Sequence, residues 1–392
     1  MKKLIFISAF LSLSLSAQTT LAVKPAEVVV KVSEIKQDRA AEKDARKAEQ
    51  EARKAAAGKG RNNRSEPQDP ADALLALGRH NESLLATPNV VGTGVSWKRD
   101  GNPVIKVFTS GRANLPRTLD GIEVSKANVG GFYALNLTCD ERDGGVGCDG
   151  QDAAEAQNGT GETEAVSPSD WHIRPVPIGV SIGDASDSAG TLGCRVSSGC
   201  HQYALSNAHV VTENGAEVLQ PSALDGGLAP DDAIANMYAS VPIVLGTGPE
   251  VANTVDAALY DVESNSVGTA TRSNGYGEPR VTTIAASLDL AVQKYGRSSA
   301  MTTGFVDTIN ATVIVSYAEG DARFVNQFIV QSDTQGVDFS LPGDSGSLVV
   351  AAGGENDRSP VGLLFASGKG YTVANPIDDV LSELGVEIDG EF

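Results

Sequence analysis

The chain has 392 residues, of which 41% are hydrophobic, and a formal net charge of −19 at pH 7. Residues 1–70 are basic, with 14 Lys and Arg against 9 Asp and Glu, so the acidic charge belongs to the rest of the chain. An acidic body argues against nucleic acid as a partner, and 42 glycines among many short Val, Ile and Thr runs favour β-structure over long helices.

Residues 1–22 have the pattern of a secretory signal, in which Lys2 and Lys3 precede a short apolar run and a small-residue cleavage region. No other stretch reaches the length of a membrane span. We therefore expect an exported protein, periplasmic or secreted, without a stable membrane span. Residues 23–70 are expected to form a charged, Ala-rich helical arm and a linker, with Glu42 and Arg46 at helical pair spacing.

Residues 71–138 indicate a small α+β unit. Alanines and leucines predict a helix near 72–77, and apolar runs predict strands near 90–91, 104–108 and 122–124. The residue types in this unit do not identify its function.

The next two segments differ sharply in composition. Residues 139–170 are acidic, Gly-rich and poor in large apolar residues, which indicates a linker or a disulfide-closed loop. In residues 171–388 short strand-like runs alternate with turn residues, as an all-β barrel requires. Near the C-terminus the period changes to that of a helix, with Pro376 at its first position and Gly385 at its end. Its apolar residues are Ile377, Val380, Leu381 and Leu384.

The four cysteines fit an oxidising compartment and suggest two local disulfides. Cys139 and Cys148 flank a Gly- and Asp-rich loop, and Cys194 and Cys200 flank an expected hairpin tip. We expect the pairs Cys139–Cys148 and Cys194–Cys200, although four cysteines allow three connectivities. A zinc site formed by Cys194, Cys200 and His201 is the alternative.

Three short motifs carry the residue types of nucleophilic catalysis. They are Ser206-Asn207-Ala208-His209, Thr254-Val255-Asp256-Ala257 and Gly343-Asp344-Ser345-Gly346-Ser347. A serine hydroxyl needs a base within hydrogen-bond reach, and the base needs an orienting group. Each motif has an ordinary interpretation when taken alone. Ser345 could belong to a simple turn, His209 could be structural like His80, His172 or His201, and Asp231 or Asp261 could replace Asp256.

The order His209, Asp256, Ser345 and the intervals of 47 and 89 residues resemble those of trypsin/chymotrypsin-like serine peptidases. A narrower resemblance is to bacterial relatives of the plant narrow-leaf protein family. It is carried by residues 87–94 (TPNVVGTG), 180–183 (VSIG) and 295–297 (YGR).

This resemblance implies a mainly β fold, a chymotrypsin-like double β-barrel with a C-terminal helix, preceded by the small α+β unit and the charged helical arm. The first barrel would supply His209 and Asp256, and the second Ser345. The backbone N–H groups of Gly343 and Ser345 would form the oxyanion hole.

Some positions depart from the family pattern. Ser347 stands where a second glycine is common, and Phe339, with Asp338 beside it, stands where trypsin-type enzymes place the floor of the specificity pocket. A preference for Lys or Arg is therefore not expected. Asp344 has no partner that the sequence identifies, because a trypsin-style activation site is absent.

The function expected from the sequence is an exported serine endopeptidase that acts on protein or peptide substrates and needs no metal or other cofactor. One alternative is a protease-fold binding or assembly protein whose hydrolysis is minor or confined to itself. An esterase that uses the same triad is another. The sequence leaves a homo-oligomer open.

Overall fold

The computed structural model describes residues 70–98, 100–135, 137–138, 166–186, 188–262 and 265–390. They all fall within one of the chain's two units, Pro67–Phe392. The expected signal segment, the charged arm up to residue 69, and residues 139–165 with Cys139 and Cys148 lie outside the described residues. Within the described part of the chain, no helix combines the length and apolarity needed to cross a membrane.

Six strands of the larger sheet close into a ring. Pairing runs in the order β16, β19, β20, β21, β18, β17, and β17 also pairs with β16. These strands are β16 (Ala291–Gly296), β17 (Ala300–Tyr317), β18 (Gly320–Ser332), β19 (Leu348–Ala351), β20 (Pro360–Gly368) and β21 (Tyr371–Pro376). Apolar residues such as Val292, Val306 and Phe328 fill one buried cluster of this sheet.

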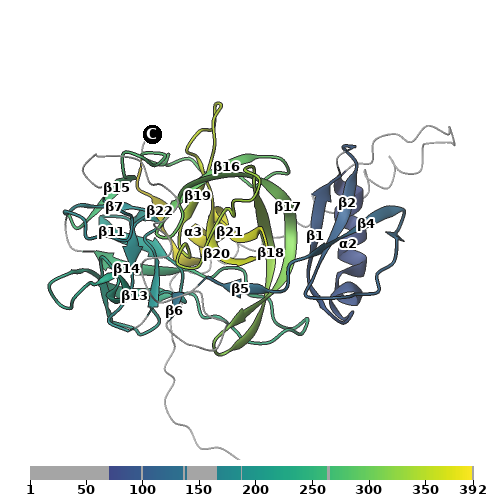
Figure 1. Cartoon of the computed structure of the whole chain (residues 1–392), viewed down its shortest axis with the longest axis horizontal. Coiled ribbons are helices and arrows are strands. Elements are labelled where there is room, and N and C mark those ends of the chain that lie inside the picture. Colours follow the sequence, from purple (N-terminus) through teal and green to yellow (C-terminus); the bar gives the residue numbers. More distant parts are fainter. Residues whose placement is uncertain are drawn as a thin grey trace, which may run out of the picture. The chain divides into compact units, whose positions relative to one another are not determined.

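A second sheet of six strands has the order β12, β13, β14, β11, β10, β22. The strands are β10 (Cys194–Ser198), β11 (His201–Ser206), β12 (Glu217–Leu219), β13 (Ala233–Ser240), β14 (Ala258–Val262) and β22 (Glu387–Ile388). Shorter strands lie around it: β6 (Leu137–Thr138), β7 (Val176–Ile178), β8 (Ser181–Ile182), β9 (Ser188–Thr191) and β15 (Val267–Thr271), with the 3-10 turn η2 (Ala223–Asp225). This second sheet lies beside the ring (Figure 1), and residues of both, such as Leu259 and Leu363, share one buried apolar cluster.

The mainly β class and the C-terminal helix are confirmed. Helix α3 (Ile377–Leu384) begins one residue later than expected, because Pro376 precedes it as the N-cap. Gly385 ends the helix in the left-handed conformation, φ 66°, which glycine adopts without steric cost. Ile377 and Val380 are buried, in the same apolar cluster as residues of the second sheet.

Residues 70–128 form one helix and four strands: α2 (Pro70–Leu85), β1 (Val90–Trp97), β2 (Pro103–Thr109), β3 (Thr118–Leu119) and β4 (Ile122–Asn128). The helix buries Ala73, Ala76, Leu77 and Leu84 in a cluster that includes residues of β1 and β2. Strand β1 pairs antiparallel with β17, so these strands extend the same sheet that forms the ring (Figure 1). Gly94 permits this pairing, because a Cβ there would collide with Thr308.

One further strand, β5 (Phe132–Ala134), pairs with both β17 and β20. Leu137 and Thr138 then pair with Ala189 and Ser188 of β9. The chain between residues 132 and 138 therefore runs from the ring to the strands around the second sheet.

The expected Cys194–Cys200 disulfide is wrong, and both cysteines are free thiols. Cys194 opens β10 opposite Leu205, whereas Cys200 lies at the exposed turn where β10 passes into β11. A strand advances about 3.3 Å per residue, so the two Cα atoms lie beyond the reach of about 7 Å that a disulfide bridges. The same separation prevents Cys194, Cys200 and His201 from sharing one zinc ion.

Candidate active site

Three predicted residues meet where the two sheets face each other. His209 Nε2 lies 2.8 Å from Ser345 Oγ, and His209 Nδ1 lies 2.5 Å from Asp256 Oδ2. His209 follows β11, Asp256 precedes β14 and Ser345 precedes β19, so two of the residues come from the second sheet and one from the ring. All three are buried. The arrangement is that of a nucleophile, a base and an orienting carboxylate.

The Asp256 carboxylate accepts hydrogen bonds from three further donors. The backbone N–H groups of Ala208 and His209 donate to Oδ1 at 2.8 and 3.3 Å. The Tyr317 hydroxyl donates to Oδ2 at 2.8 Å. Burial, together with the adjacent Asp256, holds the pKa of Tyr317 well above its usual range, so this hydroxyl keeps its proton at neutral pH. No motif in the sequence indicates Tyr317, which is 61 residues from its partner.

Asn375 of β21 holds the backbone of Asp256 from the opposite sheet. The Asp256 N–H donates to Asn375 Oδ1 at 3.2 Å, and Asn375 Nδ2 donates back to the Asp256 carbonyl at 3.2 Å. The same amide donates to the Leu363 carbonyl of β20 at 3.1 Å. Asn375 thus fixes the orienting residue relative to the strands that flank the nucleophile.

The turn around Ser345 depends on two glycines. Gly343 and Gly346 have φ values of 93° and 91°, a conformation that residues with a Cβ rarely adopt. Thr191 of β9 fastens this turn, because its N–H donates to the Ser345 carbonyl at 2.7 Å and its hydroxyl to the Gly343 carbonyl at 2.9 Å. The Gly343 N–H, predicted as an oxyanion donor, points to a carbonyl oxygen, that of Leu135, at 2.8 Å.

Asp344 has a buried partner, Lys294 of β16. The Lys294 Nζ lies 3.0 Å from Asp344 Oδ2, and both side chains are fully buried. Ser299 and the Leu341 N–H also donate to Oδ2. Burial alone would raise the pKa of Asp344, but Lys294 and these donors outweigh it and hold the pKa below its usual value. Lys294 is therefore the partner of Asp344 that the sequence did not identify, and it neutralises this buried carboxylate.

The two short motifs at residues 180–183 and 295–297 meet at Asp225. Ser181 Oγ donates to Asp225 Oδ2, and Arg297 forms a two-pronged ion pair with the same carboxylate. Gly296 lacks a Cβ because one there would lie 2.5 Å from Asp344 Oδ1. These motifs therefore support the turn that carries Ser345.

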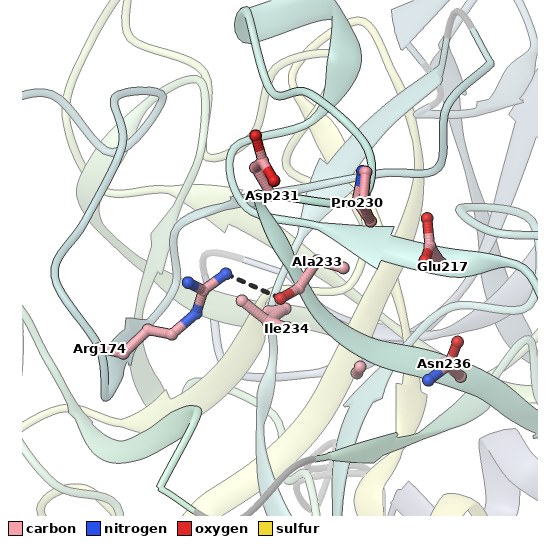
Figure 2. A pocket seen from close by; sticks show the side chains of 8 residues that line it. Arg174, Glu217, Pro230, Asp231, Ala233, Ile234 and Asn236 are labelled. Carbon is pink, nitrogen blue, oxygen red and sulfur yellow. Dashed lines mark hydrogen bonds between the residues drawn. The ribbon is translucent and has the colours of Figure 1, made fainter.

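The other aspartates and histidines that could have taken the places of Asp256 and His209 lie outside this site. Asp231 lines a pocket of about 360 Å³, and His209, Asp256 and Ser345 are not among its lining residues. In this pocket Arg174 Nη2 donates to the Ala233 carbonyl at 2.7 Å (Figure 2). Asp261 is exposed on β14. His80 contacts Asp120, His172 contacts the Ser167 carbonyl, and His201 is exposed.

The structure shows the surroundings of Phe339, Asp338 and Ser347, at or beside the positions that depart from the family pattern. Phe339 is buried and Asp338 is exposed. The Ser347 hydroxyl donates to the Asp344 carbonyl at 2.6 Å, so this serine is satisfied inside the turn.

A family model, the Nal1 C-terminal domain, matches residues 279–373. No curated protein matches the sequence. Solved structures that resemble the chain include protease A of Thermobifida fusca, with 17% identity and a TM-score of 0.40 over 55% of this chain and 98% of that one. A glutamic acid specific serine protease has 19% identity and a TM-score of 0.40 over 55% and 100%. Chymotrypsin of Cellulomonas bogoriensis has 17% identity and a TM-score of 0.37 over 55% and 98%.

The chain has a mainly β fold, and its residues 279–373 are similar to the Nal1 C-terminal domain. That matched stretch contains Lys294, Tyr317 and Ser345.

Proposed function

We propose that the protein is a serine endopeptidase that uses Ser345, His209 and Asp256. The observation that carries the proposal is the pair of hydrogen bonds at the His209 ring: Nε2 can accept the Ser345 hydroxyl proton, and Nδ1 can donate to the Asp256 carboxylate. Ser345 also lies two residues after the Gly343 N–H, which already donates to a carbonyl oxygen.

The reaction follows from these contacts. Ser345 Oγ attacks the substrate carbonyl while His209 Nε2 accepts its proton, and the Gly343 and Ser345 N–H groups stabilise the oxyanion. His209 then gives the proton to the leaving amine, and water hydrolyses the acyl-enzyme by the same route. Asp256 keeps a proton on Nδ1 and stabilises the imidazolium, and Tyr317 helps to hold this carboxylate.

The substrates are proteins or peptides, and the enzyme acts outside the cytoplasm after export through the segment 1–22. Export would also permit a Cys139–Cys148 disulfide, which non-reducing peptide mapping would find. Four free thiols in the exported protein would refute that pairing.

Activity is tested with a mixed peptide library and a fluorophosphonate probe that labels nucleophilic serines. Ser345→Ala and His209→Ala should lower turnover by roughly a millionfold, and Asp256→Asn by about ten-thousandfold, because the imidazole then takes the wrong tautomer. Ser273→Ala, which changes an exposed serine outside the site, is the matched control. Wild-type turnover in purified Ser345→Ala would refute the proposal.

A second candidate function is a protease-fold binding or assembly protein that hydrolyses only itself. One contact favours it, namely the hydrogen bond from Gly343 to the chain's own Leu135. Labelling of Ser345 together with hydrolysis of library peptides supports the endopeptidase, whereas labelling without peptide hydrolysis supports the second candidate.

A further inference from the structure

A segment of the chain itself lies against the predicted reacting groups. The Leu135 carbonyl accepts the Gly343 N–H at 2.8 Å, and the Leu135 N–H donates to the Phe365 carbonyl at 3.1 Å. The Ser345 hydroxyl lies 3.3 Å from the same Phe365 oxygen. The Leu135 carbonyl therefore lies at the Gly343 N–H, one of the two predicted oxyanion donors. The Leu135 N–H and the Ser345 hydroxyl share the Phe365 oxygen, which places this segment beside the predicted nucleophile as a substrate would lie.

Strand pairing holds the segment on the amino side of Leu135. Residues of β5 run antiparallel to β20, with Ala134 opposite Ala366 and Tyr133 opposite Ser367. A peptide added to a sheet edge in this way is bound through its backbone, and alternate side chains enter the protein. Leu135 is 3% exposed and belongs to the apolar cluster that contains Phe339, whereas Tyr133 is 52% exposed.

Pairing continues on the carboxyl side of Leu135. Leu137 and Thr138 run antiparallel to β9, opposite Ala189 and Ser188. Strand β9 ends at Thr191, which fastens the turn of Ser345. The chain is thus held on both sides of one carbonyl group, as an extended substrate would be.

On the proposed chemistry of Ser345, we infer that the first substrate of this protein is its own chain, cleaved after Leu135. Ser345 Oγ forms a bond to the Leu135 carbonyl carbon, and His209 takes the hydroxyl proton. The C–N bond to Asn136 breaks, and His209 returns the proton to the Asn136 amine. Water then releases the acyl group as the Leu135 carboxylate and regenerates Ser345.

Two features favour cleavage over a stable inhibitory contact. The leaving side is held by pairing over only two residues, Leu137 and Thr138, so the new amine can separate from the ester. The amino side is anchored between β17 and β20, which keeps the acyl group in place for hydrolysis. The same contacts imply that external substrates are preferred when an apolar residue such as leucine occupies the acyl position.

The experiment compares the full wild-type chain with Ser345→Ala by intact mass spectrometry and N-terminal sequencing during incubation at neutral pH. We expect the wild type to give one product that ends at Leu135 and one that begins at Asn136, at a rate independent of protein concentration. Ser345→Ala should stay intact. In the peptide library, leucine should be preferred over lysine and aspartate before the cleaved bond.

Two variants test the acyl position. Leu135→Asp should slow self-cleavage by at least roughly tenfold, because a charged side chain is rejected by an apolar pocket. Tyr133→Ala, on the same strand but exposed, should cleave near the wild-type rate. If Leu135→Asp fails to fold, as circular dichroism would reveal, the wild type and Ser345→Ala still decide the question, since neither alters the segment.

The outcomes separate the two proposals. Self-cleavage after Leu135 is overturned if a wild type that is active and labelled at Ser345 stays intact or is cut elsewhere. It is also overturned if the cleavage rate depends on protein concentration. In each of these cases the proposed endopeptidase activity still holds. Cleavage after Leu135 in Ser345→Ala overturns self-cleavage by Ser345 too. If Ser345 is labelled in neither the wild type nor a folded Leu135→Asp, and neither peptides nor the chain are cut, the proposed function itself fails.

Discussion

At the scale of single residues, Tyr317 is the contact that the motifs do not reveal. Its hydroxyl shares Asp256 Oδ2 with His209 Nδ1, so in the proposed mechanism it acts only through the carboxylate and is a positioning residue. A hydrogen bond to a charged group contributes about 1.5–3 kcal/mol.

Tyr317→Phe should therefore lower kcat by roughly 10- to 100-fold and leave KM nearly unchanged. Tyr371→Phe, which removes the hydroxyl of a different tyrosine, on β21, is the control. The measurement is steady-state kinetics on the best library peptide. A purely structural role would instead raise KM or lower the unfolding temperature without this selective loss of kcat.

The buried pair Lys294–Asp344 makes a prediction about stability. Lys294→Met would leave an uncompensated carboxylate and should cost about 3–5 kcal/mol at pH 7. Adding Asp344→Asn should recover much of that cost, because the buried charge is then absent. The free energy of unfolding of the wild type, both single variants and the double variant measures the coupling.

The pH dependence of the same pair has a definite sign. Lys294 and the donors around Asp344 lower the pKa of that carboxyl in the folded state, so its contribution is present above the unfolded pKa of about 4 and is lost as the pH falls below it. In Lys294→Met, burial would raise the pKa of Asp344 instead, and ionisation would then destabilise the fold. The stability difference between wild type and variant should shrink from pH 7 to pH 4, and a constant difference would contradict this account.

At the scale of elements, the sequence predicts those features that a short, local residue pattern determines. His209, Asp256 and Ser345 were found because each lies in a short motif, and α3 because its apolar spacing and Gly385 are local signals. The predicted Cys194–Cys200 disulfide was wrong because the extent of β10 is set by its pairing with β11. The residues between the two cysteines do not determine it.

Strand β17 shows why the long-range strand pairings could not be predicted from the sequence. The strand-like run of residues in this region covers only 312–317, whereas β17 covers Ala300–Tyr317. Asn310, with φ 50°, lies where its register against β18 shifts, a conformation that asparagine tolerates. One strand can therefore pair with β16, β1 and β5 in turn. The positions of Tyr317 and of Leu135 follow from these long-range pairings, which no local pattern encodes.

At the scale of the whole molecule, the described elements belong to the unit Pro67–Phe392, in which β1 and β5 are paired with the ring. Residues 23–66 belong to the other unit and offer little apolar surface in the sequence. Deleting residues 23–66 should therefore change the unfolding temperature by less than about 2 °C, a shift of under about 1 kcal/mol for a domain of this size.

Deleting residues 70–134 should be far more harmful. Strand β5 and its neighbours cover Val313, Val315 and Phe365, and these lie in one buried cluster with Phe108 and Phe132. Exposing three such side chains costs about 5–9 kcal/mol, at about 1.5–3 kcal/mol each, and it frees the edges of β17 and β20 for aggregation. Thermal unfolding and light scattering of both truncations, prepared from Ser345→Ala so that self-cleavage does not interfere, give the comparison. If the 70–134 deletion were as stable and monodisperse as the full chain, these strands would be a separable module and would not complete the sheet that carries the site.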